Sequence, residues 1–225
     1  MSFPAEVRRR EVILAKCGLA GFVAIPSGAR GAVIFAHGSG SSRFSPRNQM
    51  VGAHLNEAGI ATLLFDLLTD IESADRRNVF NVSLLAARLR EATAWARTQA
   101  DIPKPLGYFG ASTGGAAAIL AAAAEGERIS AIVSRGGRPD LAPLEALQSI
   151  TAPTLLIVGE RDVEVLALNR FALAEMKCEA ELSIVPNATH LFEEEGALER
   201  VAELAKDWFL KYFHSGGGAD GRISS

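Results

Sequence analysis

The amino-acid sequence predicts an α/β fold with a mostly parallel central sheet and helices on both of its faces. Two observations lead to this prediction. Short apolar runs alternate along the chain with stretches whose apolar residues recur at helical spacing. One such run, PLGYF, passes into an alanine-rich helix former through the glycine-framed corner GASTGG at residues 110–115. In a sheet of this kind, the ligand site lies beyond the carboxyl ends of the strands.

The first half of the chain predicts an edge hairpin followed by two buried strands. EVILAKCGLAGFVAIP (residues 11–26) contains two strand-like runs that meet at Gly18, as in an antiparallel hairpin. The run at 31–36 is apolar throughout, which is typical of the interior of a parallel sheet, and IATLLFD at 60–66 is the next buried strand. Between them, residues 46–58 carry apolar side chains at helical spacing before a glycine stop. A polar loop is expected after the second buried strand.

The second half continues the alternation of helix and strand. The expected elements are, in order, a helix whose apolar face begins at Leu85 and runs to about Ala100, the alanine-rich helix 116–124, a strand at 129–134, a strand at 152–159, a helix near 163–177, a strand at 180–185 and an amphipathic helix with Val201, Leu204, Trp208 and Tyr212. No insertion is long enough to form a cap. We therefore expect one domain over residues 1–213 without a cap domain, followed by a flexible tail at 214–225.

Composition excludes several classes of protein. The 225 residues carry a formal net charge of −3, without the polycationic stretch that nucleic-acid binding requires. Cys17 and Cys178 lie far apart and outside any CxxC or Cys/His cluster, which argues against zinc and favours a reduced compartment. No run of 18 apolar residues and no export signal is visible. We expect a cytoplasmic protein that binds neither nucleic acid nor membrane and needs no metal or cofactor.

The corner Gly110–Gly114 has the pattern of a nucleophile elbow. Glycines that flank a central residue remove the Cβ atoms that would clash where a strand turns sharply into a helix. The central residue, Ser112, is then held in a strained conformation at the carboxyl edge of the sheet. The helix that follows directs its free N–H groups and its dipole toward the serine. The alternative is a glycine-rich turn with an incidental serine.

A serine nucleophile requires a histidine base and a carboxylate that orients the histidine. In this architecture both come later in the chain, the acid before the histidine, each just after a strand. Asp162 follows the strand PTLLIVG, and His190 lies in the loop after the next strand. Glu160 is a rival for the acid. Asp162 is preferred because Glu160 comes earlier in the turn, and the polar stretch after Gly159 is needed for the chain to bend toward the histidine.

The same chemistry requires two backbone N–H groups that stabilise the oxyanion. One comes from the residue after the nucleophile, here Thr113, and the other from the loop after the third strand. That loop is AHGSGSSR, in which Ser39 is the preferred donor and Gly38 the next choice. Its glycines allow the backbone to approach a substrate closely.

This loop also permits a different interpretation. A buried strand, Gly38-x-Gly40-x-x-Arg43, a helix and a later Asp66 imitate the fingerprint of a dinucleotide-binding site. Two details weigh against it: arginine replaces the third glycine, where it would obstruct packing of the helix on the sheet, and the strand is not the first of the chain. A nucleoside triphosphate site finds no support either, because the sequence lacks GxxxxGK[ST].

Four arginines fall in loops on the expected site edge: Arg43, Arg47, Arg135 and Arg138. An arginine in such a loop is most often simply solvated. Two that converge on the pocket would instead bind a carboxylate or phosphate, and the substrate would then be anionic. Our candidates for substrate contacts are His37, Gly38, Arg43 and Arg135.

The elbow at 110–114, Asp162, His190 and the loop HGSGSSRFSPRN together resemble the α/β-hydrolase superfamily. Within it the chain is similar to the small, capless dienelactone hydrolase-like branch. SRGGRPDLA and APTLLIVGERD are similar to members that occur alone or fused to a phosphoribosyltransferase domain, of which no pattern is visible here. The resemblance implies Ser112 as nucleophile, with Thr113 and Ser39 as oxyanion donors. One difference matters: dienelactone hydrolases proper use a cysteine nucleophile, whereas this elbow holds serine.

The expected function is that of a serine hydrolase that cleaves a small carboxylic ester, lactone or thioester through an acyl-enzyme. His190 would serve as general base and acid, and Asp162 would orient it. Two alternatives remain. A cofactor-free perhydrolase or acyltransferase would use the same residues, and a non-catalytic binding or scaffold protein would keep only the fold. The sequence does not predict the oligomeric state.

Overall fold

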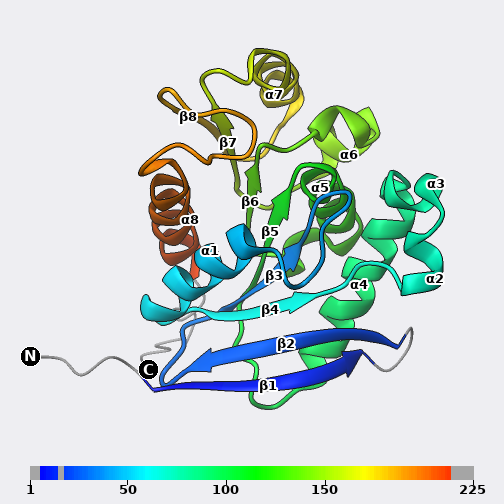
Figure 1. Ribbon diagram of the computed structural model, residues 1–225, viewed down its shortest axis with the longest axis vertical. Coiled ribbons are helices and arrows are strands. Elements are labelled where there is room, and N and C mark those ends of the chain that lie inside the picture. Colours follow the sequence, from blue (N-terminus) through cyan, green and yellow to red (C-terminus); the bar gives the residue numbers. More distant parts are fainter. Residues whose placement is uncertain (1–5, 15–17, 214–225) are drawn as a thin grey trace, which may run out of the picture.

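A computed structural model describes residues 6–14 and 18–213 of the chain. Cys17 and the predicted flexible tail at 214–225 lie outside the described residues. In the described part, one sheet has the strand order β1-β2-β4-β3-β5-β6-β7-β8 (Figure 1). Its strands are β1 (Val7–Leu14), β2 (Leu19–Pro26), β3 (Ala32–Ala36), β4 (Ala61–Phe65), β5 (Leu106–Ala111), β6 (Ala131–Arg135), β7 (Thr154–Gly159) and β8 (Ala180–Val185).

The sheet is mostly parallel, as predicted. β1 pairs antiparallel with β2, and β2 pairs antiparallel with β4, so the predicted hairpin forms one edge. Each remaining pair of neighbours, from β4 and β3 across to β7 and β8, is parallel. The carboxyl ends of β3, β5, β6, β7 and β8 therefore meet at one edge of the sheet.

Helices cover both faces of the sheet, which confirms the predicted α/β-hydrolase architecture without a separate cap domain (Figure 1). One face carries α1 (Pro46–Glu57) and α8 (Ala197–Phe213). The other carries α4 (Val82–Thr98) and α5 (Thr113–Glu125), and α6 (Leu144–Ser149) and α7 (Val163–Glu175) extend that layer. No helix among the described residues has the length and apolarity that crossing a membrane requires.

The prediction of a polar loop after β4 is wrong in one respect. This stretch contains two short helices, α2 (Asp70–Ser73) and α3 (Arg76–Val79). A capping box begins the first: Glu72 N–H donates to Thr69 Oγ1 at 3.2 Å, and Thr69 N–H donates to Glu72 Oε2 at 2.9 Å. Helices of four residues are too short to show an apolar periodicity, so only the cap leaves a trace in the sequence.

The core consists of two apolar layers because successive strand residues point to opposite faces of the sheet. Val33, Phe35 and Phe109 pack toward α1 and α8, where the two phenylalanine rings lie 4.8 Å apart between centroids. Ile34 and Tyr108 belong to the layer beneath α4 and α5. Burial on both faces explains why these strands are apolar throughout, and it fixes the edge at which their polar successors emerge.

Candidate active site

Ser112 occupies the turn between β5 and α5 with a backbone that non-glycine residues seldom adopt. Its φ is 51° and its ψ is −120°. Three backbone hydrogen bonds hold it: Ser112 N–H donates to Arg135 O at 3.2 Å, and its own carbonyl accepts from Gly115 N–H at 2.9 Å and from Arg138 N–H at 3.1 Å. The strained corner that the sequence predicts is therefore present.

Glycine is required on both sides of this corner because the start of α5 presses against the sheet. A Cβ atom on Gly110 would lie 2.4 Å from Gly114 O, and one on Gly114 would lie 2.0 Å from Ala36 O. Those distances are far below van der Waals contact. The two glycines thus let α5 begin directly beneath the serine, so that its N-terminal N–H groups and dipole face Ser112.

His190 and Asp162 meet at the same edge of the sheet. His190 Nδ1 lies 2.6 Å from Asp162 Oδ2, and the two side chains are 38% and 14% exposed. The rival acid, Glu160, instead accepts a hydrogen bond from Asn187 N–H at 2.8 Å. The carboxylate that contacts the histidine is therefore the one the sequence favours.

The loop after β8 is held so that the imidazole of His190 faces inward. Phe192, only 2% exposed, anchors the loop in the core and adopts a positive φ of 56°. Thr189 N–H donates to Glu194 Oε2 at 3.1 Å. Gly136, after β6, lies against the ring, because a Cβ there would sit 3.4 Å from His190 Cε1.

Ser112 and His190 line one hollow of about 240 Å³. Arg135, Arg47 and the loop after β3 complete most of its wall. Within the described part of the chain, no hydrogen bond joins Ser112 Oγ to the His190 ring. The nucleophile and the base of the predicted triad thus share a cavity, and their catalytic roles stay predictions.

Of the two expected oxyanion donors, Ser39 lines the hollow and Thr113 directly follows Ser112 in the chain. Among the described residues, neither the N–H of Thr113 nor that of Ser39 donates to another group of the protein. Gly38 passes directly beside the nucleophile, since a Cβ on it would lie 3.1 Å from Ser112 Cβ. Two unused donors therefore remain near Ser112, and their role in stabilising an oxyanion stays a prediction.

His37 fixes the loop after β3 from within the protein. Leu67 N–H donates to His37 Nε2 at 3.1 Å, so the ring proton resides on Nδ1, which donates to Gly38 O at 3.0 Å. Burial lowers the pKa of His37 below its usual value and keeps the ring neutral. Both ring nitrogens are thus engaged in holding the backbone of the loop, and a substrate contact for His37 stays a prediction.

The structure separates the four loop arginines into two pairs. Arg43 binds Asp66 through its backbone N–H at 2.8 Å and through its guanidinium, and Arg138 binds Asp140 at 2.7 and 2.8 Å. The carboxylate of Asp66, which a dinucleotide site would need for the ribose, is therefore bound to Arg43 instead. Arg135 and Arg47 line the hollow with Ser112, and Arg43 lines a different one.

Sequence reasoning did not select every residue that builds the site. Asn48, buried near the start of α1, lines the hollow. Asn169, on α7, donates to Gly137 O at 2.9 Å and so secures the loop that supports His190. Neither residue carries a sequence signal, because each acts through a contact far away along the chain.

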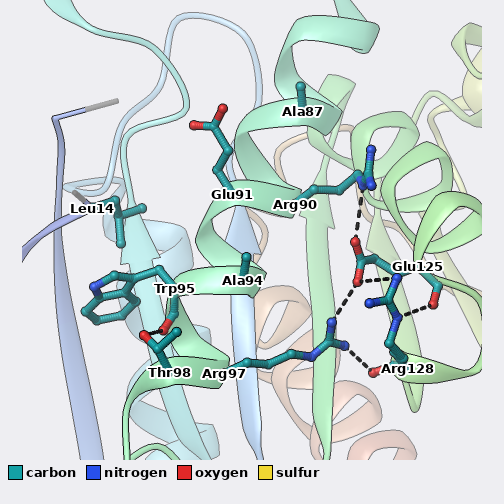
Figure 2. A pocket seen from close by; sticks show the side chains of 10 residues that line it. All are labelled: Leu14, Ala87, Arg90, Glu91, Ala94, Trp95, Arg97, Thr98, Glu125 and Arg128. Carbon is teal, nitrogen blue, oxygen red and sulfur yellow. Dashed lines mark hydrogen bonds and ion pairs between the residues drawn. The ribbon is translucent and has the colours of Figure 1, made fainter. Parts of the chain in front are cut away.

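A larger hollow, of about 810 Å³, lies along α4 and shares no residue with the hollow that contains Ser112 (Figure 2). Its arginines point to Glu125 at the end of α5. In the described ranges 6–14 and 18–213, no three potential metal ligands gather into a cluster.

The fold is that of an α/β hydrolase. Residues 29–206 match the family described as the alpha/beta hydrolase domain, and the chain belongs to that family. Within the family it is dienelactone hydrolase-like: a crystal structure of a dienelactone hydrolase from Anabaena variabilis is 50% identical, with a TM-score of 0.88, and covers 93% of this chain and 99% of its own.

Further relatives extend the comparison. Two Mycobacterium tuberculosis proteins, each named "Putative phosphoribosyl transferase", are 53% identical over 210 residues, or 93% of this chain. The chain spans only 47% of their length. The esterase domain of a Rhodothermus marinus protein shares the fold at 18% identity, with a TM-score of 0.71 and coverage of 92% of this chain and 99% of that one. The family match and the 50% identical dienelactone hydrolase support an enzyme of the hydrolase class.

Proposed function

We propose that this protein is a serine hydrolase that cleaves a small carboxylic ester, lactone or thioester through an acyl-enzyme. One observation carries the proposal: the hydrogen-bonded pair of His190 and Asp162 lies at the hollow into which the strained Ser112 turn opens. A serine hydroxyl becomes a nucleophile only beside a positioned base, and a base is most effective when a third group orients it.

In the acylation step, His190 Nε2 takes the proton of Ser112 Oγ as that oxygen bonds to the substrate carbonyl carbon. The electron pair of the C=O bond moves to oxygen, where the N–H groups of Thr113 and Ser39 stabilise the oxyanion. Asp162, bound to Nδ1, stabilises the imidazolium. The C–O bond to the alcohol, or the C–S bond of a thioester, then breaks, and His190 gives its proton to the leaving group.

Deacylation repeats the sequence with water. His190 removes a proton from the water that attacks the acyl carbon, a second oxyanion forms in the same place, and Ser112 Oγ leaves and recovers a proton from His190. The 240 Å³ volume of the hollow favours a compact substrate. Phosphoribosyl transfer is not proposed for this chain, because the hydrolase family accounts for residues 29–206 of the region shared with the mycobacterial proteins.

The proposal is tested by steady-state hydrolysis of p-nitrophenyl esters of graded acyl length, together with lactones. Ser112→Ala is expected to fold normally and to lower kcat by at least about 10³-fold, leaving only the rate enhancement due to binding. Asp162→Asn keeps the shape of the site but misorients the histidine, with an expected loss of about 10²- to 10⁴-fold. Glu160→Gln is the matched control, because Glu160 lies beside this site without contacting His190.

Wild-type activity that survives in Ser112→Ala would refute the proposal. Equal losses in Asp162→Asn and Glu160→Gln would remove Asp162 from its assigned role. Product analysis with competing alcohols and with peroxide separates hydrolysis from acyl transfer and perhydrolysis, since these differ only in what attacks the acyl-enzyme. No turnover of any ester, together with no covalent labelling of Ser112, would indicate a binding protein on this fold.

The cytoplasmic location and the single domain over 1–213 stay predictions.

A further inference from the structure

Arg135 places a guanidinium beside the nucleophile at the end of β6. Strand alternation puts it on the same face as Ala131 and Val133, which pack toward α1 and α8. Arg135 is only 8% exposed, and its side chain lines the hollow that contains Ser112. A buried strand end that carries arginine rather than an apolar residue needs an explanation in terms of charge.

The guanidinium has no acceptor in the described part of the chain. Its Nε and Nη1 are buried without a hydrogen-bond partner, and no carboxylate lies within ion-pair distance. Its charged neighbour is a second cation, Arg47, and the ring of Phe192 lies 5.9 Å from it. Burial and the charge of Arg47 lower the pKa of Arg135 to about 10, so it is still a cation at neutral pH.

The surroundings of Arg135 are short of negative charge. Arg47 Nε is also buried without a partner among the described residues, while its Nη1 reaches Glu193 Oε1 at 3.1 Å near the surface. The amide oxygen of Asn48, in the same hollow, lacks a partner within those ranges as well. Buried N–H donors of Arg135 and Arg47, and one buried amide oxygen, therefore lack partners around one small cavity, which is the pattern of a site that a polar ligand completes. The N–H donors are the groups that an anion would satisfy.

The neighbouring arginines show that the chain supplies a partner where an arginine has a structural role. Arg43 has Asp66 and Arg138 has Asp140, each with two hydrogen bonds from arginine to aspartate. A buried cation without an anion is costly, and folding alone would favour an apolar residue at position 135. A substrate with an anionic group would supply the partner that Arg135 lacks in the described part of the chain.

We propose that the substrate of this hydrolase carries an anionic group, a carboxylate or a phosphate, that binds Arg135 and Arg47 in the hollow beside Ser112. The inference rests on the proposed hydrolysis at Ser112 and specifies the class of substrate. Charge-assisted hydrogen bonds from two guanidinium groups orient such a group, and the reacting carbonyl then lies at the serine. Arg135 is a binding residue in this account and takes no part in proton transfer.

The test compares kcat/KM for matched esters, each corrected for spontaneous hydrolysis. The acyl-side set is 4-nitrophenyl hemiglutarate, 4-nitrophenyl 4-phosphonobutanoate and the neutral methyl 4-nitrophenyl glutarate. The alcohol-side pair is 4-acetoxybenzoate and its methyl ester. We expect the wild type to prefer the anionic member of at least one set by about 10- to 100-fold. The better of carboxylate and phosphonate identifies the group.

Arg135→Met is expected to abolish that preference, measured within the variant as the ratio of kcat/KM for the anionic ester to kcat/KM for its neutral counterpart. Arg135→Lys keeps the charge but loses the guanidinium fork, so it restores only part of the preference. The matched control is Arg170→Gln, an exposed arginine on α7 that is not part of the site. The rate of labelling by a fluorophosphonate and the melting temperature report whether the Ser112 site of each variant is intact.

Equal kcat/KM for charged and neutral esters in the wild type would overturn the inference, and so would an anionic preference that persists in Arg135→Met. Either result leaves the proposed hydrolysis standing, because the neutral esters and the fluorophosphonate still report a reactive Ser112. Failure of the proposed function looks different: the wild type would then cleave no ester of either set and would not be labelled.

Discussion

Two buried charges near opposite ends of α5 differ in whether the protein supplies a partner of opposite charge. Glu125, at the carboxyl end of the helix, has a side chain that is 7% exposed, and it is bound by three arginines (Figure 2). Arg97 donates to it at 2.7 Å and Arg90 at 3.1 Å, and Arg128 lies 3.4 Å away. Arg135, near the amino end of the same helix, is buried to a similar degree and has no anion among the described residues.

The difference separates a charge that holds the fold together from one reserved for a ligand. Around Glu125, each arginine links the end of α5 to α4 or to the turn that follows, so the cluster closes a structural joint. Charge-assisted hydrogen bonds from the arginines offset the free-energy cost of burying the Glu125 carboxylate. No such hydrogen bonds offset the burial of Arg135, so this residue lowers the stability of the fold at the site where a substrate would bind.

Removing Glu125 is expected to have the largest effect on stability. Glu125→Ala leaves three arginines without their common acceptor and should lower the free energy of unfolding by about 3–5 kcal/mol. Hydrolysis of a neutral ester should be unchanged below the melting temperature, since the cluster lies far from Ser112. Urea unfolding and steady-state kinetics on the same preparation measure both. A variant with wild-type stability would show that the cluster is only a surface feature.

The pH dependence of unfolding sharpens the same point. Burial raises the pKa of Glu125, but the hydrogen bonds from Arg97 and Arg90, together with the charges of Arg128 and Arg97, outweigh burial, and the pKa falls below its usual value. A carboxylate with a lowered pKa stabilises the fold fully above its unfolded value of about 4.3, and this stability is lost as the pH falls through the folded value. Glu125→Gln should therefore lose less stability on acidification than the wild type. Parallel curves for the two proteins would contradict this.

The matching change at the other charge is expected to act in the opposite direction. Arg135→Met replaces an unpaired buried cation with an apolar side chain that fits the apolar face of β6, and it should raise the free energy of unfolding by about 1–2 kcal/mol. Thermal and urea unfolding at neutral pH measure the change. A loss of stability would mean that Arg135 is bound within the protein, and the contrast with Glu125 would disappear.

The smallest effect is expected within the Glu125 cluster. Arg90 is 48% exposed at its side chain, so Arg90→Ala should cost less than about 1 kcal/mol, as is usual for exposed pairs. Arg97 is 25% exposed and also donates to Arg128 O at 2.9 Å, so Arg97→Ala should cost more. Equal losses from the two variants would show that burial does not rank these ion pairs.

Much of the fold was predictable, because its signals are local. Each buried strand is a short apolar run, and the corner at Ser112 is framed by Gly110 and Gly114, which the packing of α5 requires. The contact of His190 with Asp162 rather than Glu160 was also predictable, because Glu160 comes earlier in the turn after Gly159. The helices α2 and α3 were missed because four residues cannot show a periodicity.

The binding side of the site was much less predictable. Arg43 and Arg135 carry the same sequence signal, an arginine in or beside a loop after a buried strand. What distinguishes them is a carboxylate 23 positions away: Asp66 lies beside Arg43, and none lies beside Arg135 in the described ranges. Pairing of that kind depends on which strands are neighbours in the sheet, and a single sequence does not reveal it.

Covalent labelling tests the central claim most directly. The wild-type protein, treated with a fluorophosphonate and analysed by intact mass and peptide mapping, is expected to gain one adduct on the peptide that contains Ser112. Ser112→Ala should gain none, and His190→Gln should react much more slowly. An adduct on another residue, or equal labelling of Ser112→Ala, would contradict the assignment of Ser112 as the nucleophile.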